Sequence, residues 1–175
     1  MLITSLYTQG DEAAIARLEV RNGIVLPASI WFSLPENRDV ISAMKADWRT
    51  EIFLLSPDEN PDQDSLYAIL LKADGFYPKI SRSFKPTEGL AIYKWLEQYM
   101  VSATVPFWPA LKKMLDLLEQ SPSEASPLAM AFLQGCIEAQ RHIRKKDFVL
   151  AGSVVERTSR QYIPVSQWRA GPQYF

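Results

Sequence analysis

The sequence is poor in the residues from which most catalytic and metal sites are built. Its 175 residues include one histidine, one cysteine and seven glycines. A structural zinc site takes four ligands, usually Cys and His, and Cys136 with His142 supplies only two. A lone cysteine also excludes an intrachain disulfide, a usage typical of reducing compartments. The composition therefore predicts a cytoplasmic protein with no metal site and no cofactor.

The seven glycines are dispersed along the chain, which argues against the common phosphate-binding loops. No two of them form a G-x-G pattern, and none precedes a Lys-Ser or Lys-Thr pair. Phosphate cradles need clustered glycines because backbone N–H groups must approach the anion closely. A G-x-S-x-G nucleophile elbow is absent as well. We expect neither a dinucleotide site nor a P-loop.

Two groups of residues partly match the pattern of a catalytic or metal-binding site, but each lacks a required feature. On one helix, Cys136 and His142 stand six residues apart, about 600° of rotation, so their side chains point about 120° apart. We therefore expect Cys136 to pack in the core rather than act as a nucleophile. Residues 58–64 space oxygen ligands as a calcium loop does, but Gln63 replaces the required glycine and Ile69 the required glutamate. This segment predicts a solvated acidic loop.

The chain carries no pattern typical of a membrane protein. Its first twelve residues lack the basic region of a secretory leader. No apolar stretch approaches the roughly 18 residues of a spanning helix. We expect no membrane partner.

Hydrophobic periodicity predicts strands through most of the first half of the chain. Residues 1–7 are an apolar strand candidate. Residues 16–21 and 24–32 flank an Asn-Gly pair, which favours a hairpin because a type I′ turn needs two residues at positive φ. A helix over residues 12–21 is the rival interpretation. Further strands are expected at 51–55, 66–71 and 76–84, the last two as a second hairpin around Asp74-Gly75.

Four helices are predicted, each after a residue that suits a helix start. Ser33 and Glu36 form a capping box before the first helix. Prolines open the other three near residues 86, 106 and 127, because the first N–H groups of a helix have no partner within it. The four apolar stripes are Val40, Ile41, Met44 and Trp48; Ile92, Leu96, Tyr99 and Ala103; Phe107, Leu111, Leu115 and Leu118; and Leu128, Phe132, Cys136, Ala139 and Ile143.

Together these elements predict an α+β fold in a single domain over residues 1–175. A strand-rich part (1–85) precedes a helical part (86–146), and a C-terminal β-hairpin with a tail (147–175) follows. The expected architecture has one or two antiparallel sheets with hairpins, packed against about three to four helices. Parallel β-α-β alternation is not the pattern.

Charge is unevenly distributed, although the formal net charge is −1. Residues 1–64 carry 11 acidic and 5 basic side chains, whereas residues 141–175 carry 2 acidic and 7 basic ones. The basic region also holds aromatic side chains, and arginine beside aromatics suits phosphates, stacked bases and protein interfaces. The predicted partner-binding residues are Arg141, Arg144, Lys145, Lys146, Arg157, Arg160, Trp168, Arg169 and Tyr174.

These observations predict a non-catalytic binding protein: an adaptor, inhibitor or assembly subunit that engages a protein partner or a second copy of itself. The alternative is an accessory protein that binds nucleic acid through residues 141–146 and the C-terminal hairpin. The pI of 5.9 lies below the value of about 9 typical of dedicated nucleic-acid domains. A carboxylate-based enzyme is the lesser alternative. If the acidic and basic regions pair within one molecule, the case for a charged binding face largely disappears.

Overall fold

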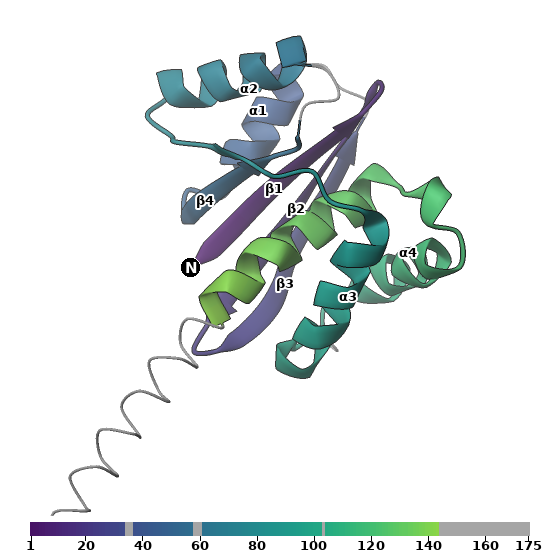
Figure 1. Ribbon diagram of the computed structural model, residues 1–175. Coiled ribbons are helices and arrows are strands. Elements are labelled where there is room, and N and C mark those ends of the chain that lie inside the picture. Colours follow the sequence, from purple (N-terminus) through teal and green to yellow (C-terminus); the bar gives the residue numbers. More distant parts are fainter. Residues whose placement is uncertain (34–36, 58–60, 103, 144–175) are drawn as a thin grey trace, which may run out of the picture.

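A computed structural model describes residues 1–33, 37–57, 61–102 and 104–143. Its centre is a five-stranded sheet with the strand order β3-β2-β1-β4-β5. Figure 1 labels β1 to β4. The strands are β1 (Leu2–Gln9), β2 (Glu12–Arg21), β3 (Ile24–Ser33), β4 (Thr50–Leu55) and β5 (Lys79–Ile80). The first three strands pair antiparallel, whereas β4 pairs parallel with both β1 and β5.

The Asn-Gly hairpin was predicted correctly. Asn22 and Gly23 both have positive φ, 53° and 81°, as a type I′ turn requires, and they join β2 to β3. The rival helix over residues 12–21 is wrong, because this segment is the central antiparallel partner of β1 and β3.

The predicted antiparallel sheet is wrong, because the sheet is mixed. Helix α1 (Asn37–Lys45) connects β3 to β4, and α2 (Pro61–Ala73) connects β4 to β5. A helix between two strands carries the chain back to its starting end, so that the strands run parallel. For the β4–β5 pair, the misreading arose at residues 66–71, a short apolar run whose periodicity does not separate a strand from a buried helix. In the structure this run belongs to α2.

The pair Asp74-Gly75 ends α2 instead of turning a hairpin. Gly75 has φ 85°, and its N–H donates to the carbonyl of Lys72 at 3.0 Å. The N–H of Phe76 donates to the carbonyl of Leu71, also at 3.0 Å. These two bonds define a Schellman motif with glycine after the helix end. The second predicted hairpin is therefore replaced by a helix and the two-residue strand β5.

Helix α1 buries the predicted Val40, Ile41 and Met44, but Trp48 does not continue their stripe. The helix ends at Lys45, and the Asp47 carboxylate accepts a hydrogen bond from the backbone N–H of Arg49 at 3.1 Å. This turn leaves Trp48 86% exposed.

Helices cover both faces of the sheet (Figure 1). On one face, α1 and α2 enclose a core that includes Leu6, Ile15 and Leu55. On the other face lie α3 (Pro86–Leu96), α4 (Trp108–Gln120) and a helix over residues 127–143. Short 3-10 turns follow the first two of these, at Glu97–Tyr99 and Pro122–Glu124.

The helix over residues 127–143 confirms its predicted stripe. Leu128, Phe132, Cys136, Ala139 and Ile143 are all buried. Ser126 begins the helix by accepting a hydrogen bond from the N–H of Ala129 at 3.2 Å. The predicted C-terminal hairpin lies outside the described residues. Within them, no helix has the length and apolar character needed to cross a membrane.

Candidate functional site

The 127–143 helix lies very close to the central strand β1. A Cβ atom added at Gly135 would stand 2.9 Å from Leu18 Cδ1 and 3.2 Å from Ser5 Oγ, so a larger residue would require these side chains to shift. Ser5 Oγ donates toward the carbonyl of Ala131 at 2.6 Å, and Gln134 Nε2 donates to the carbonyl of Leu6 at 3.3 Å. The helix is thus fixed over the middle of the sheet, and pockets open along its sides.

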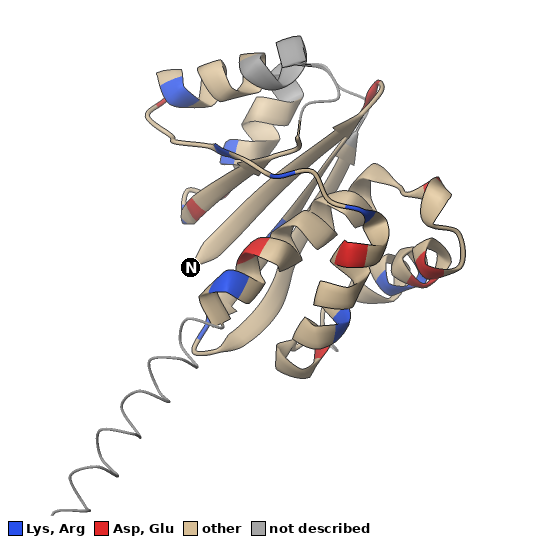
Figure 2. Ribbon diagram, in the orientation of Figure 1, with Lys and Arg blue, Asp and Glu red and all other residues tan. Residues whose placement is uncertain are grey.

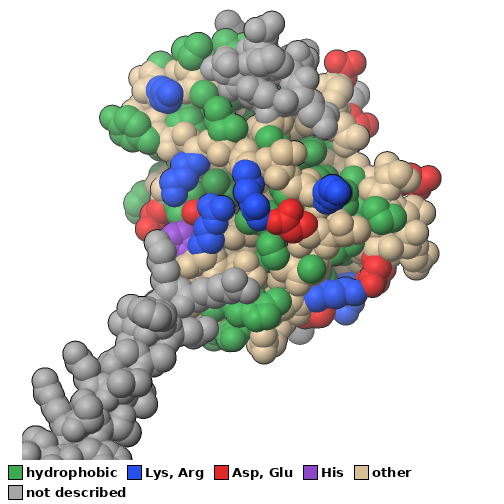
Figure 3. Space-filling model, viewed as in Figure 1, with side chains coloured by type: hydrophobic (Ala, Val, Ile, Leu, Met, Phe, Trp, Pro, Cys, Tyr) green, Lys and Arg blue, Asp and Glu red, His purple; other side chains and the backbone are tan. Residues whose placement is uncertain are grey.

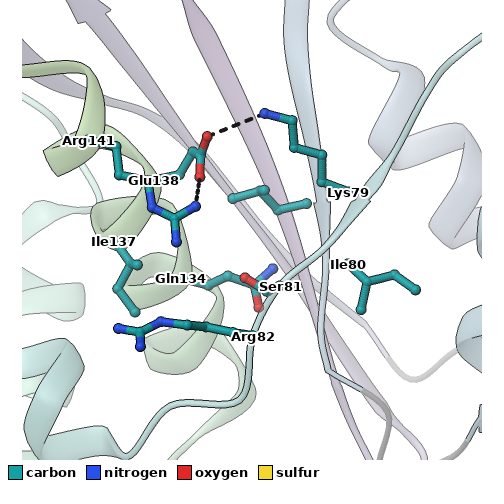
Figure 4. Close-up of a pocket in the computed structure, with 9 residues that line it drawn as sticks. Lys79, Ile80, Ser81, Arg82, Gln134, Ile137, Glu138 and Arg141 are labelled. Atoms are coloured by element: carbon teal, nitrogen blue, oxygen red, sulfur yellow. Dashed lines mark hydrogen bonds and ion pairs between the residues drawn. The ribbon is translucent and has the colours of Figure 1, made fainter. Parts of the chain in front are cut away.

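One pocket, here called the cationic pocket, lies between this helix and the chain that includes and follows β5. Its volume is about 210 Å³. Figure 4 shows Lys79 and Arg82 entering from the β5 segment, and Gln134, Glu138 and Arg141 from the helix. The lining residues are Leu54, Lys79, Ile80, Ser81, Arg82, Gln134, Ile137, Glu138 and Arg141. Three cations and one carboxylate therefore converge from segments more than fifty residues apart.

The carboxylate of Glu138 organises two of these cations. Its Oε2 stands 2.9 Å from Arg141 Nη1, and its Oε1 stands 3.5 Å from Lys79 Nζ and 3.3 Å from His142 Nε2. Burial opposes ionisation of Glu138, but the hydrogen bond from His142 and the charges of Lys79 and Arg141 outweigh it. The pKa of Glu138 therefore lies below its ordinary value. The side chain of Glu138 is 7% exposed, whereas those of Lys79 and Arg141 are 60% and 56% exposed.

The lowered pKa of Glu138 predicts an acid-sensitive contribution to stability. A carboxyl whose pKa is lower in the folded state stabilises the fold above its unfolded pKa and loses that contribution as pH falls through the folded pKa. For Glu138 the loss begins as pH falls past the ordinary value of 4.5. We expect Glu138→Gln to be less stable than wild type by about 1–2 kcal/mol at pH 7, since its ion-pair partners face solvent. Urea unfolding of both proteins from pH 7 to pH 3 should show this difference shrinking; a constant difference would contradict the assignment.

Gln134 forms the inner wall of the cationic pocket and is fully buried. The carbonyl of Leu6 can only accept, so the amide must turn its Nε2 toward that oxygen. In the described part of the chain, Oε1 is then left without a hydrogen-bond partner. Buried polar atoms are usually satisfied by protein, water or ligand, so this atom marks the inner wall as polar.

Basic side chains gather on the face that holds this pocket. Arg82 also pairs with Glu88 at the start of α3, and Lys85 stands three residues beyond Arg82. Figure 2 shows Lys and Arg along the β5–α3 segment and at the end of the 127–143 helix, and Figure 3 shows them over one surface. The spacing Lys79, Arg82, Lys85 in an extended segment places cations at intervals of about 10 Å.

A second pocket, here called the uncharged pocket, lies beyond the carboxyl ends of β1 and β4. Its volume is about 270 Å³. Its lining residues are Tyr7, Gln9, Pro57, Ser83, Phe84, Pro86, Ala125 and Met130. None of them is ionised at neutral pH. Ligands of open sheets with parallel strands commonly bind at this edge, so the pocket has the position of a binding site without the charges of a metal site.

Of the residues predicted to bind a partner, the structure describes Arg141, which lines the cationic pocket. The others lie outside the described residues: Arg144, Lys145, Lys146, Arg157, Arg160, Trp168, Arg169 and Tyr174. Sequence reasoning missed Lys79, Arg82 and Gln134, and it did not single out Glu138 among the carboxylates on helices. The regular spacing of basic residues from Lys79 to Lys85 was an available signal for the first two.

Cys136 and His142 do not form a reactive pair. Cys136 is fully buried, and burial raises the pKa of its thiol, so that the neutral form persists. His142 contacts Glu138 instead.

No protein-family model matches the sequence. No curated protein matches it either. Among solved structures, the Holliday junction resolvase of fowlpox virus superposes with a TM-score of 0.52 over 81% of this chain and 99% of the resolvase, at 14% identity. This chain has the fold of that resolvase. The nuclease domain of the human cytomegalovirus terminase (TM-score 0.46, 8% identity, 77% of this chain, 79% of that one) is also similar. The large terminase of a thermophilic bacteriophage is similar too (TM-score 0.46, 8% identity, 58% of this chain, 27% of that one).

The resolvase fold corrects the functional interpretation of the sequence. The sequence predicted a non-catalytic adaptor, inhibitor or assembly subunit, and it predicted that the protein is not an enzyme. Both predictions are contradicted, because the matched fold is that of a resolvase. The error arose from treating scarce His, Cys and Gly as evidence against catalysis. Catalysis by carboxylates needs none of these three residue types.

Many nucleases hold two metal ions between carboxylates, and the described residues do not fit that arrangement. Among them, no three or more His, Cys, Asp or Glu side chains lie close enough to hold a metal ion. Glu138 is surrounded by Lys79, Arg141 and His142, which compete with a cation for its oxygens.

Proposed function

We propose that this chain is a nucleic-acid-processing protein that binds branched DNA through the face carrying the cationic pocket. The observation that carries the proposal is the match to nearly the whole length of a resolvase, an enzyme named for its action on Holliday junctions. This match favours the alternative hypothesis of a nucleic-acid partner over the hypothesis of a protein partner. The cationic pocket supports it independently, since it gathers three basic side chains on one face.

The chemistry of these side chains suits DNA phosphates. Arg82 and Arg141 carry planar guanidinium groups that donate two parallel hydrogen bonds to one phosphate. Their side chains are 60% and 56% exposed, so both are accessible to a large ligand. Glu138 holds Arg141 and Lys79 in place before the ligand arrives, which lowers the entropy lost on binding.

The proposal is tested by comparing a fluorescent four-way junction with a linear duplex of the same sequence. Fluorescence anisotropy at several salt concentrations gives both affinities. We expect tighter binding of the junction and a log affinity that falls linearly with log salt, because bound phosphates release counterions. Equal affinity for junction and duplex would overturn the preference for branched DNA. Absence of binding at low salt would overturn the function.

Removing divalent metal is expected to leave junction binding unchanged. The proposed contacts are made by Lys and Arg side chains. The described residues contain no cluster of three or more His, Cys, Asp or Glu that could hold a metal ion. The same anisotropy titration with Mg²⁺ and with excess EDTA at matched ionic strength measures this. A loss of affinity in EDTA would show that a bridging cation takes part.

The basic residues that follow Arg141 extend the same proposal. Arg144, Lys145 and Lys146 continue the sequence from the rim of the cationic pocket. Replacing the three with glutamine should reduce the salt slope of junction binding without changing the melting temperature of the protein. An unchanged slope would remove this segment from the interface. Self-association, the single-domain boundary and a cytoplasmic location stay predictions of the sequence.

A further inference from the structure

We propose that the uncharged pocket binds an unstacked nucleobase of the bound strand. This inference rests on the proposed function and adds to it a second site with a different ligand chemistry. It assigns base contacts to Tyr7 and Phe84, and leaves the phosphate contacts with the cationic pocket.

The walls of the uncharged pocket match the two surfaces of a base. A base has flat apolar faces and a polar edge, and it stacks readily on aromatic rings whatever its sequence. Tyr7 and Phe84 contribute two half-buried rings, while Gln9 and Ser83 contribute exposed polar groups. No charged group lines the pocket, so a phosphate has no partner there.

The volume of the uncharged pocket favours a ligand of the size of one nucleobase. Pockets for whole small molecules span about 300–1,000 Å³. At about 270 Å³, the uncharged pocket falls just below that range and suits a single ring system.

The segment after β5 joins the two pockets. Arg82 lines the cationic pocket, and Ser83, Phe84 and Pro86 line the uncharged one. In an extended chain, Arg82 and Phe84 stand about 7 Å apart. One nucleotide can therefore place its phosphate against Arg82 and its base against Phe84. A base that is already unpaired or mismatched costs least to unstack, so such a base is the expected occupant.

The test replaces Phe84 with leucine, which keeps apolar volume but removes the ring. Phe84 Cε2 would lie 3.1 Å from a Cβ at Gly89, so the ring packs against α3, and leucine preserves more of that packing than alanine. The probes are a duplex with one unpaired adenine and the fully paired duplex. Stacking of one base contributes about 1–3 kcal/mol, so we expect affinity for the bulged probe to fall about 10-fold. Binding of the paired duplex and the salt slope should not change.

Two further variants keep the inference falsifiable. Phe84→Tyr retains a ring and should restore bulge affinity. Trp48→Leu removes an aromatic side chain that is 86% exposed and lines neither pocket, and should have no effect. If Phe84→Leu folds normally and binds both probes as wild type does, the base site is wrong while the proposed function stands. If wild type binds neither probe at low salt, the proposed function itself fails.

Discussion

Replacing Lys79, Arg82 and Arg141 together with glutamine is expected to weaken junction binding about 100-fold at physiological salt. Each phosphate contact contributes about 0.9 to the slope of log affinity against log salt. Three contacts therefore give a slope of about 2.7. With this slope, these contacts strengthen binding by about two decades at about 0.15 M salt relative to 1 M salt. Glutamine preserves length and polarity, so the loss isolates charge. Anisotropy across a salt series measures both the affinity and the slope.

A matched control removes the same charge elsewhere. Lys94, Lys112 and Lys113 lie on α3 and α4, and none lines either pocket. Their triple glutamine variant has the same net charge as the pocket variant. If affinity followed overall charge alone, both variants would weaken equally. A pocket variant with an unchanged slope would show that DNA binds to another face.

Replacing Phe132 with alanine is expected to cost about 3–5 kcal/mol of folding stability, the largest effect predicted for any single substitution here. Phe132 is 1% exposed and lies in the 127–143 helix over the sheet. Its ring centroid stands 5.9 Å from those of both Tyr93 and Trp108, in edge-on geometry. Alanine removes these contacts and leaves a cavity that α3, α4 and the helix must collapse into.

Urea denaturation measures this loss, and Phe32→Ala is the matched control. Phe32 lies on the edge strand β3 and is 52% exposed, so the same substitution there should cost less than about 1 kcal/mol. Similar losses for the two variants would contradict the assignment of Phe132 to the core. Junction affinity of the remaining folded Phe132→Ala protein should also fall, since the helix supplies one wall of the cationic pocket.

Local patterns in the sequence predicted local structure well. The Asn-Gly pair determined the β2–β3 turn, because few residues adopt two successive positive φ values. The stripe from Leu128 to Ile143 identified a helix that is buried at every expected position. In both cases the deciding interactions lie within a few residues, so spacing alone carries the information.

Contacts between distant segments were not predictable in the same way. The run at residues 66–71 has no period long enough to choose between strand and helix, and the parallel pairing of β4 with β5 depended on that choice. The cationic pocket combines Lys79 with Glu138, which are 59 residues apart. The spacing of residues along the sequence does not indicate that two such distant residues are in contact. The amide of Gln134 became significant only once its burial was known.

The two-residue strand β5 has a consequence for how binding specificity can change. It pairs with β4 at Leu54 and Leu55, and the N–H of Ser81 donates to the carbonyl of Leu55 at 2.8 Å. The opposite wall, the 127–143 helix, is anchored to the sheet through a buried core. The helical wall of the cationic pocket is therefore part of the core, whereas the β5 wall joins the sheet through only two paired residues. Substitutions at the exposed Lys79, Arg82 and Ser83 can therefore change ligand choice with little effect on folding stability.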